Sequence, residues 1–238
     1  SSVTVADTFD AGQYDDMYYV RFVSGSGEGL WSTIESTDTN TLTLANTDVL
    51  DHVTVDDAFR VYPHHTIDSL FPAGMLGMSY LDGTTILLYE NDLDDMQQNK
   101  SAVGTTTYFT ALEQWFGSFD GTAVIEPETK FVIRNASDTE DLVFTAFGDV
   151  PDYTVSRLVA ADGDLLIGTG YPVPVVLKNA GLAADNRVAI IADNAATGIN
   201  KSGVSATYFD ALGEWFGAEV DGDSELGAST AFTLRLPA

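Results

Sequence analysis

The sequence predicts an all-β protein, made of duplicated sandwich-like or barrel-like β-modules that follow an N-terminal β segment. Three observations lead to this prediction. Short runs of β-branched and aromatic residues recur along the 238-residue chain, clusters of Gly, Asn, Asp and Ser separate these runs, and one aromatic motif occurs twice. Helical periodicity is weak, and only residues 108–116 and 208–216 are ambiguous in this respect.

The expected strands follow from residue type. Branched and aromatic side chains fit the pleated surface of a sheet, and several of the runs alternate polar with apolar residues. In chain order, we expect strands at 18–23, 41–44, 59–62, 84–89, 131–134, 173–177, 188–191 and 232–236. Glycine and short polar residues predict hairpin turns, because they accept the backbone angles of tight turns, at 24–27, 161–164 and 221–224.

The internal repeat is the most informative feature. Asn99-Lys100-Ser101 precedes a motif at 108–117, and Asn200-Lys201-Ser202 precedes its counterpart at 208–217, with seven of ten positions identical. A period of about 100 residues is longer than the roughly 20–50 residues of a solenoid repeat. The repeat therefore predicts a duplicated β-module. We expect three parts: an N-terminal β segment at 1–69, a first module at 70–150 and a second module at 151–238.

Several stretches carry a resemblance to a known family. Residues 18–31 combine a Tyr-Tyr-Val-Arg-Phe strand with a Gly-rich turn, residues 40–44 read Asn-Thr-Leu-Thr-Leu, and residues 59–72 run from Phe-Arg-Val-Tyr-Pro to Leu-Phe-Pro. With the Asn-Lys-Ser, Trp and Phe-x-Ile-Arg elements, they resemble an uncharacterised family of secreted β-rich proteins from verrucomicrobial bacteria. The resemblance implies export and a β-rich fold, and it supplies no catalytic residue.

The charge balance excludes some partners. The chain has 36 acidic and 10 basic residues, a net charge of −26, so its field repels nucleic acid and anionic lipid surfaces. No apolar run approaches the roughly 18 residues of a membrane helix, so we expect no membrane insertion. At about 1 M salt the screening length falls to roughly 3 Å, which would suit a saline habitat. An ordinary acidic secreted protein explains the composition equally well.

The sequence contains few residues or motifs that are typical of an active site. The absence of Cys excludes disulfides and thiolate chemistry, and no nucleophile-elbow, zinc-protease or phosphate-loop motif occurs. The chain has three histidines, His52, His64 and His65. Neighbours on a strand point to opposite faces, so His64 and His65 would not readily share a metal, and a strand end running into a turn explains them. We therefore expect no enzymatic activity.

Two sets of residues are candidate binding sites. Calcium is the only cofactor that the sequence suggests, at Asp162 and Asp164 in one predicted turn and at Asp221 and Asp223 in another, although turn chemistry alone also explains these four residues. A glycan could stack on indole rings, for which the candidates are Trp31, Trp115 and Trp215. The favoured interpretation of the repeated tryptophans is that they form the core of each module.

The leading functional hypothesis is an exported structural subunit. It would act outside the cell or at its surface, as the resemblance implies, and would form a homo-oligomer or homopolymer such as a fibre, sheath or layer, because the β-modules are duplicated and carry few catalytic motifs. The start at Ser1 without Met fits a processed protein or a trimmed chain, of which processing is the favoured interpretation. Its N-terminal strand, with Val3, Val5 and Phe9, could pair with a neighbour's open sheet edge. The alternatives are an adhesin or carbohydrate-binding module, an enzyme such as a glycoside hydrolase or lyase, and a virion structural protein from a saline host.

Overall fold

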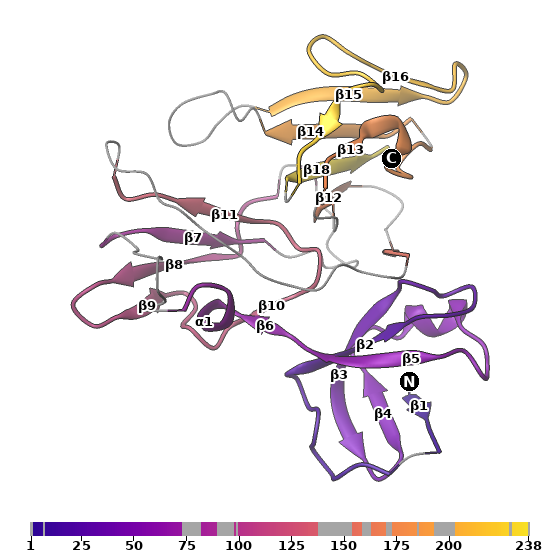
Figure 1. Cartoon of the computed structure of the whole chain (residues 1–238), viewed down its shortest axis with the longest axis vertical. Coiled ribbons are helices and arrows are strands. Elements are labelled where there is room, and N and C mark those ends of the chain that lie inside the picture. The colour runs from indigo at the N-terminus through magenta and orange to yellow at the C-terminus, as the bar shows by residue number, and fades with distance from the viewer. Residues whose placement is uncertain are drawn as a thin grey trace. The chain divides into compact units, whose positions relative to one another are not determined.

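The computed structural model describes most of the strands and turns of the chain (Figure 1). The described residues are 2–6, 8–72, 82–89, 98, 100–137, 154–158, 163–169, 173–184, 186–192, 203–228 and 230–237. They form several antiparallel sheets with one four-residue α-helix, so the predicted all-β class is confirmed. Within these residues, no helix has the length and apolar character needed to cross a membrane.

The chain divides into two compact units. The first comprises Ser1–His65 with Pro151–Leu158, and the second comprises Thr66–Val150 with Val159–Ala238. The first unit thus ends four residues before the boundary at residue 69 that the sequence suggested, and it includes a later segment of the chain. Both copies of the aromatic motif belong to the second unit.

The first unit contains one five-stranded sheet in the order β1-β4-β3-β2-β5. The bounds of its elements are Ser2–Thr4 (β1), Tyr18–Phe22 (β2), Trp31–Asp38 (β3), Thr41–Leu44 (β4), Phe59–Pro63 (β5) and the 3-10 helix Asp48–His52 (η1). The sequence did not predict β3, because its Ser, Thr and Glu residues dilute the apolar signal. One face of the sheet covers a core whose buried members are Val20, Phe22, Leu30, Ile34, Leu42, Leu44 and Val49.

In the structure the first module starts before residue 70, because the short strand β6 (His65–Thr66) pairs with β10 of the module and leads into helix α1 (Ile67–Leu70). The Thr66 hydroxyl caps this helix by accepting a hydrogen bond from the Ser69 backbone N–H at 3.2 Å. A four-stranded sheet follows in the order β11-β7-β8-β9, and β6 pairs with β10. The bounds are Thr85–Leu88 (β7), Gly104–Phe109 (β8), Gln114–Gly117 (β9), Val124–Ile125 (β10) and Phe131–Arg134 (β11).

The second module repeats this arrangement and adds one strand. Its main sheet has the order β12-β18-β14-β15-β16, and β13 pairs with β17. The bounds are Gly163–Gly168 (β12), Val175–Val176 (β13), Leu177–Asn179 (the 3-10 helix η3), Val188–Ala192 (β14), Gly203–Phe209 (β15), Glu214–Gly217 (β16), Glu225–Leu226 (β17) and Ala231–Leu236 (β18). Tyr108 lies opposite Trp115 in the first module as Tyr208 lies opposite Trp215 in the second. The duplicated sequence therefore forms a duplicated structure.

The added strand β12 joins the two modules. Its residue Ile167 lies opposite Phe232 of β18 and also forms an isolated β-bridge with Thr129 of the first module. The expected turn at 161–164 is wrong at Gly163 and Asp164, which are the first two residues of this strand. Asp164 is accommodated in a strand because Arg235, directly opposite it in β18, pairs with its carboxylate.

The repeated tryptophans occupy equivalent core positions with different polar surroundings. The exposed fraction is 2% for Trp115 and 4% for Trp215, and their rings lie 5.2 and 5.4 Å from Tyr108 and Tyr208. The Trp115 indole N–H donates a hydrogen bond to the Phe71 carbonyl oxygen at 3.1 Å. The Trp215 indole N–H finds no acceptor among the described residues.

This difference predicts that the same substitution at Trp115 and at Trp215 lowers the free energy of unfolding by different amounts. Trp115→Phe removes a buried hydrogen bond to the Phe71 carbonyl oxygen, whereas Trp215→Phe removes a donor that has no acceptor among the described residues. We expect the free energy of unfolding of Trp115→Phe to be about 1 kcal/mol below that of Trp215→Phe. Urea denaturation of the two variants, which lose similar ring area, measures the difference. Equal stabilities would contradict the role given to the hydrogen bond.

Candidate interaction surface

The N-terminal strand pairs within its own chain. Val3 lies opposite Leu42 in the β1–β4 ladder, and the backbone N–H groups of Val5 and Phe9 donate to Asn40 and Thr39 at 2.9 and 2.7 Å. The side chains of Val3 and Phe9 pack against the core of the first unit. Donation of this strand to a neighbouring molecule would therefore exchange an existing pairing rather than fill an empty edge.

The two repeated tryptophans do not form a platform for sugar rings. Trp115 and Trp215 are buried in both modules, so neither indole offers a face to a ligand. Trp31 is half-buried, with the Tyr19 ring at 5.8 Å and the Arg157 guanidinium at 5.6 Å from its ring. The stacking interpretation is therefore corrected for Trp115 and Trp215, which are core residues, and it stays a prediction for Trp31.

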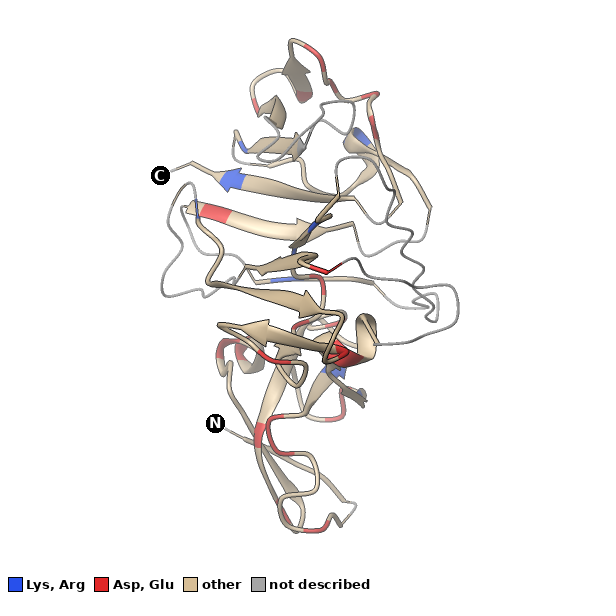
Figure 2. Cartoon of the chain, turned by 90° about the vertical axis from the view of Figure 1, so that its left-hand side faces the viewer, with Lys and Arg blue, Asp and Glu red and all other residues tan. Residues whose placement is uncertain are grey.

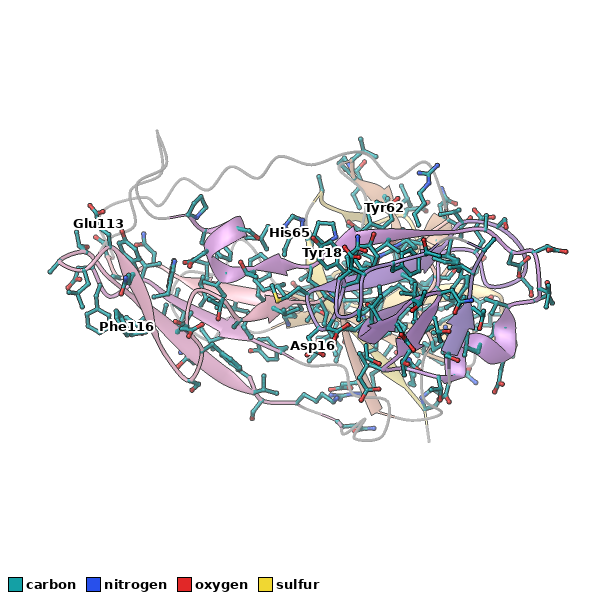
Figure 3. The ribbon with its side chains drawn as sticks, turned by 90° about the horizontal axis from the view of Figure 1, so that it is seen from below. Asp16, Tyr18, Tyr62, His65, Glu113 and Phe116 are labelled. Carbon is teal, nitrogen blue, oxygen red and sulfur yellow. The ribbon has the colours of Figure 1, made fainter. Side chains whose placement is uncertain are left out.

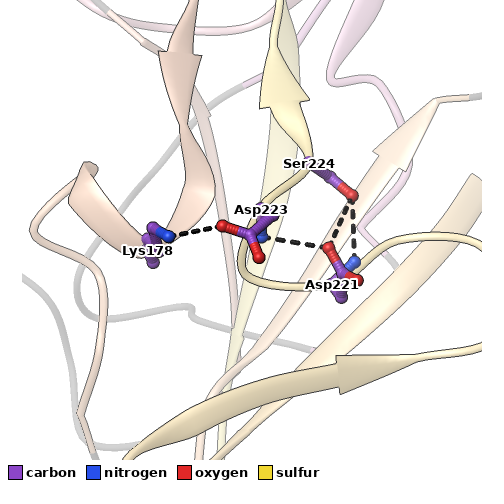
Figure 4. Close-up of polar contacts among 4 residues, drawn as sticks. All are labelled: Lys178, Asp221, Asp223 and Ser224. Carbon is purple, nitrogen blue, oxygen red and sulfur yellow. Dashed lines mark hydrogen bonds and ion pairs between the residues drawn. The ribbon is translucent and has the colours of Figure 1, made fainter.

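The candidate calcium ligands are held by other partners. Asp164 is buried and accepts two hydrogen bonds from Arg235 at 2.6 and 2.7 Å, while Asp162 lies outside the described residues. Asp221 accepts from the Ser224 hydroxyl and from the Asp223 backbone N–H (Figure 4). Asp223 in turn pairs with Lys178. In the described part of the chain, no group of three or more His, Cys, Asp or Glu side chains could hold a metal ion.

The adjacent histidines lie in different environments. His64 is 6% exposed, whereas His65 is exposed, as the alternation along a strand requires. The His64 ring lies 3.0 Å, measured from Nε2, from the Thr33 hydroxyl and contacts the rings of Tyr19 and Trp31. Burial, followed by the nearby His65, lowers the pKa of His64 to about 4. His64 is thus a neutral packing residue of the first unit at neutral pH.

The hairpins that carry the repeated motif present apolar side chains to solvent. In the first module the exposed fractions are 43% for Phe109, 60% for Leu112 and 42% for Phe116, and we call these three residues the first hairpin patch. Because Tyr108 and Trp115 face the core, the next residue on each strand faces outward. The rings of Phe109 and Phe116 meet edge to face at 5.8 Å. Figure 3 shows Phe116, with Glu113, at the end of the β8–β9 hairpin.

The second module presents the same arrangement. Phe209, Leu212 and Phe216 are 43%, 65% and 44% exposed, and we call them the second hairpin patch. The rings of Phe209 and Phe216 also meet edge to face, at 5.7 Å. Single exposed apolar residues are ordinary on protein surfaces and need no explanation. In both copies, however, the same three positions are exposed and the two rings have the same geometry. Chance exposure of single apolar residues does not explain this repetition.

Both hairpin patches lie at the margins of their sheets. β9 and β16 are the last strands in the orders β11-β7-β8-β9 and β12-β18-β14-β15-β16, and each has one strand partner among the described residues. An edge strand presents backbone N–H and C=O groups on its outer side, which a strand of another molecule can pair with. Each patch therefore combines exposed apolar side chains with a strand that is outermost among the described strands of its sheet.

The turns of the two hairpins share one backbone hydrogen bond and differ in the next, because the Glu113 N–H donates to the Thr110 carbonyl oxygen whereas the Gly213 N–H donates to the Phe209 carbonyl oxygen. The N–H groups of Leu112 and Leu212 donate to the carbonyl oxygens of Phe109 and Phe209 at 3.1 and 3.0 Å. The next residue has a positive φ, +51° at Glu113 and +69° at Gly213. Glycine adopts this conformation without strain, whereas a residue with a Cβ pays a cost. The first hairpin thus keeps an acidic residue at its tip in a conformation that glycine fits better.

The hairpin patches stand in an acidic surface. Figure 2 shows Asp and Glu on many turns and strand ends of the described ribbon, with few Lys and Arg. The exposed acids nearest in sequence are Glu113 in the first hairpin, and Asp210, Glu214 and Glu219 in the second. A charged rim around an apolar centre is the usual composition of a protein interface.

Sequence reasoning missed both patches, although the signal was present. The motif suggested core packing as a whole, whereas the alternation of a strand divides it. Once Tyr108 and Trp115 are assigned to the core, Phe109 and Phe116 must face away from it. The motif therefore contains an inward-facing pair and an exposed pair in each copy, with Tyr208 of the second copy only partly buried.

Comparison with known proteins identifies no relative. No protein-family model matches the chain, and no curated protein and no solved structure matches it. The function must therefore be argued from the chain's own residues.

The environment of His64 predicts a loss of stability in mild acid. Its pKa is about 4 in the folded protein and 6.5 when exposed, so the unfolded chain binds more protons between these values. We expect the stabilisation that comes from keeping His64 neutral to be complete above about pH 6.5. The free energy of unfolding should fall by about 2 to 3 kcal/mol as the pH drops to 4, and this loss should level off below that pH.

Denaturation of wild type and of His64→Asn across this pH range measures the contribution. The variant should show a smaller fall in stability over the same interval. His52→Asn, which removes an exposed histidine of η1, is the matched control and should follow the wild type. If His64→Asn also follows the wild type, titration of this group does not contribute.

The two ion pairs of the second module predict different substitution costs. Asp164 and Arg235 form a buried two-bond pair, whereas Lys178 and Asp223 have side-chain exposures of 56% and 79%. We expect Asp164→Asn to cost about 3 kcal/mol, because it leaves a partly buried guanidinium without its charge partner. Lys178→Ala should cost less than about 1 kcal/mol. Chemical denaturation distinguishes the two, and comparable losses would contradict this ranking.

Proposed function

We propose that the chain is an exported, non-enzymatic structural subunit that associates with copies of itself through its two hairpin patches. The observation that carries this proposal is the repetition of the exposed Phe-Leu-Phe set on both outermost strands, β9 and β16. A chain with one such patch can form only pairs. A chain with two can bind a neighbour at each patch and so extend into a fibre, sheath or layer outside the cell.

The patches are suited to weak association. Each exposes on the order of 250 Å² of apolar side-chain surface, taking about 200 Å² for a free aromatic side chain. Two facing patches would bury about 500 Å², below the roughly 1,200 Å² of a stable interface. Backbone pairing of the edge strands adds to this area. We therefore expect dissociation constants in the micromolar range or weaker for one contact, and persistent assemblies only where both patches are used.

The charge of the chain makes the association dependent on salt. Copies that each carry a net charge of −26 repel one another, and added salt screens this repulsion while strengthening the burial of apolar surface. A cationic partner would behave in the opposite way, since its attraction to the acidic surface weakens with salt. The direction of the salt effect therefore distinguishes a second copy from a basic protein.

Strand exchange offers a second route to assembly. The N-terminal strand β1 pairs with β4 of its own chain, so exchange would require its release from that pairing. The hairpin patches need no rearrangement of the fold. Association through the patches is for this reason the proposed route, and exchange of β1 is an outcome that the patch variants would reveal.

Sedimentation velocity of the full chain tests the proposal. At protein concentrations from about 10 µM to 1 mM, we expect monomer at about 0.05 M NaCl and growing assemblies toward 3 M NaCl. A variant with Phe109, Phe116, Phe209 and Phe216 all replaced by Thr should stay monomeric in all conditions. Its far-UV circular dichroism should match the wild type, while its thermal unfolding should begin at a lower temperature, because each ring is more than half buried in the monomer and belongs to an edge-to-face pair.

A matched control separates the patches from exposed apolar residues in general. Val55→Thr combined with Val173→Thr removes two side chains that are 91% and 58% exposed and lie outside the hairpins. This control should assemble as the wild type does. Wild-type protein that remains monomeric at every salt concentration, or a four-Phe variant that still assembles, would refute association through the patches.

A further inference from the structure

The sheet of the first unit carries rings and guanidinium groups on the face that points away from its core. Val20, Phe22 and Ile34 are buried on the core face, so the alternate residues of β2 and β3 lie on the opposite face. The ladders that join β2 to β3 and to β5 place these residues in two rows. We call the six residues the aromatic-basic face, with the rows Thr33-Tyr19-Tyr62 and Trp31-Arg21-Arg60.

Positive charge gathers on the aromatic-basic face. Arg21 lies directly opposite Arg60, and like charges in this arrangement lower the stability of a strand pair. The Arg157 guanidinium adds a third charge at 5.6 Å from the centre of the Trp31 ring. Three of the ten basic residues of the chain therefore lie at one face, although the chain carries 36 acids. An anionic ligand at this face would offset the repulsion between the guanidinium groups.

Acids flank the face but do not belong to it. Segments 18–22, 31–33 and 59–63, which form the two rows, contain no Asp or Glu. Among the acids nearest to these segments in sequence, three accept hydrogen bonds from backbone N–H groups of threonines and three are exposed. Asp152 and Asp162, each five positions from Arg157, lie outside the described residues. The first three acids are Asp15, Glu28 and Asp57, and the exposed ones are Asp16, Glu35 and Asp56.

The tyrosines offer a flat ring at the margin of the sheet. Tyr19 and Tyr62 stack with their ring centres 5.6 Å apart and 25° between their planes. β5 is the outermost strand beside β2 in the described sheet, so the side of the Tyr62 ring away from Tyr19 lies at the sheet margin. Arg60 is exposed and stands on the same face of the same strand. A sugar ring stacked on Tyr62 would therefore bring a carboxylate of that ring close to Arg60.

The dimensions of the face favour a small ligand over a protein. Three strands about 4.8 Å apart, with two residues about 6.6 Å apart along each, span about 10 Å by 7 Å. A stable protein interface buries at least about 1,200 Å², which is much more than this face offers. A short oligosaccharide covers the face without reaching the acids elsewhere on the chain. Those acids would repel a long polyanion such as nucleic acid.

We infer that the aromatic-basic face binds a short acidic oligosaccharide, with one sugar ring stacked on Tyr62, its uronate carboxylate at Arg60 and a second carboxylate near Arg157. Guanidinium groups suit this role, because they pair with a carboxylate through two parallel hydrogen bonds. Arg21 is buried between them and adds attraction without touching the ligand. This inference goes beyond the proposed function and does not depend on it. An exported subunit with such a site would attach to uronate-bearing polysaccharide.

Calorimetric titration of the full chain with the trimer of galacturonic acid tests the inference. At about 0.15 M NaCl the screening length is about 8 Å, so remote acids are screened, and we expect a dissociation constant on the order of 0.1 to 1 mM. The fully methyl-esterified trimer keeps the sugar rings and loses the charges, and it should bind at least about tenfold more weakly. Triaspartate and inorganic sulfate carry charge without a sugar ring, and each should also bind at least about tenfold more weakly.

Substitutions in β5 separate the ring from the charge. Arg60→Gln and Tyr62→Thr should each weaken binding of the trimer by about tenfold, whereas Tyr62→Phe, which keeps the ring, should change it by less than about twofold. Lys178→Gln is the matched control, because it removes one positive charge from an exposed ion pair of the second unit. Its affinity for the trimer should equal that of the wild type.

Several outcomes would overturn the inference. They are the absence of binding at about 10 mM trimer, equal binding of the trimer and its methyl ester, and equal binding of the trimer and either triaspartate or sulfate. Equal effects of Arg60→Gln and Lys178→Gln would also contradict it, since the charge would then act without regard to its place. None of these results bears on association through the hairpin patches, which sedimentation velocity tests separately.

Discussion

The alternation of side chains in the two repeated hairpins constrains most of what the second unit can do. Tyr108 and Trp115 must face the core, because burial of these large rings supplies much of the packing of a small module. Their neighbours Phe109 and Phe116 then face solvent by the geometry of the strand. The second copy repeats this division. One ten-residue motif thus serves two purposes, the inner pair building the module and the outer pair forming a surface.

The two copies agree in apolar residues and differ in polar ones. The Trp115 indole donates to a backbone carbonyl, whereas the Trp215 indole has no acceptor in the described part of the chain, and a glycine takes the place of Glu113 in the second turn. The second sheet also gains strand β12, held by the buried pair of Asp164 and Arg235. Packing fixes size and shape at the apolar positions, whereas polar positions depend on local partners and can diverge.

Composition and pattern were sufficient to predict the all-β class and the duplication, because both depend on local residue type and on sequence identity between the copies. The role of Asp164 was not predictable, since the residue that stabilises it in a strand lies 71 positions later in the sequence. The burial of His64 has the same cause, as its neighbours come from different strands. The hairpin patches were predictable in principle, because their positions follow from the alternation once the core residues of the motif are assigned.

Duplication within one compact unit has a consequence for assembly that two separate modules would not have. A single self-complementary patch yields closed pairs, because each contact uses the patches of both partners. A second copy of the module supplies a second patch on the same chain, and each pair then keeps an unused patch at either end. For the product to be regular, the two patches must keep a constant relative orientation. Strand β12 contacts both modules, because Ile167 lies opposite Phe232 in one module and forms a β-bridge with Thr129 in the other.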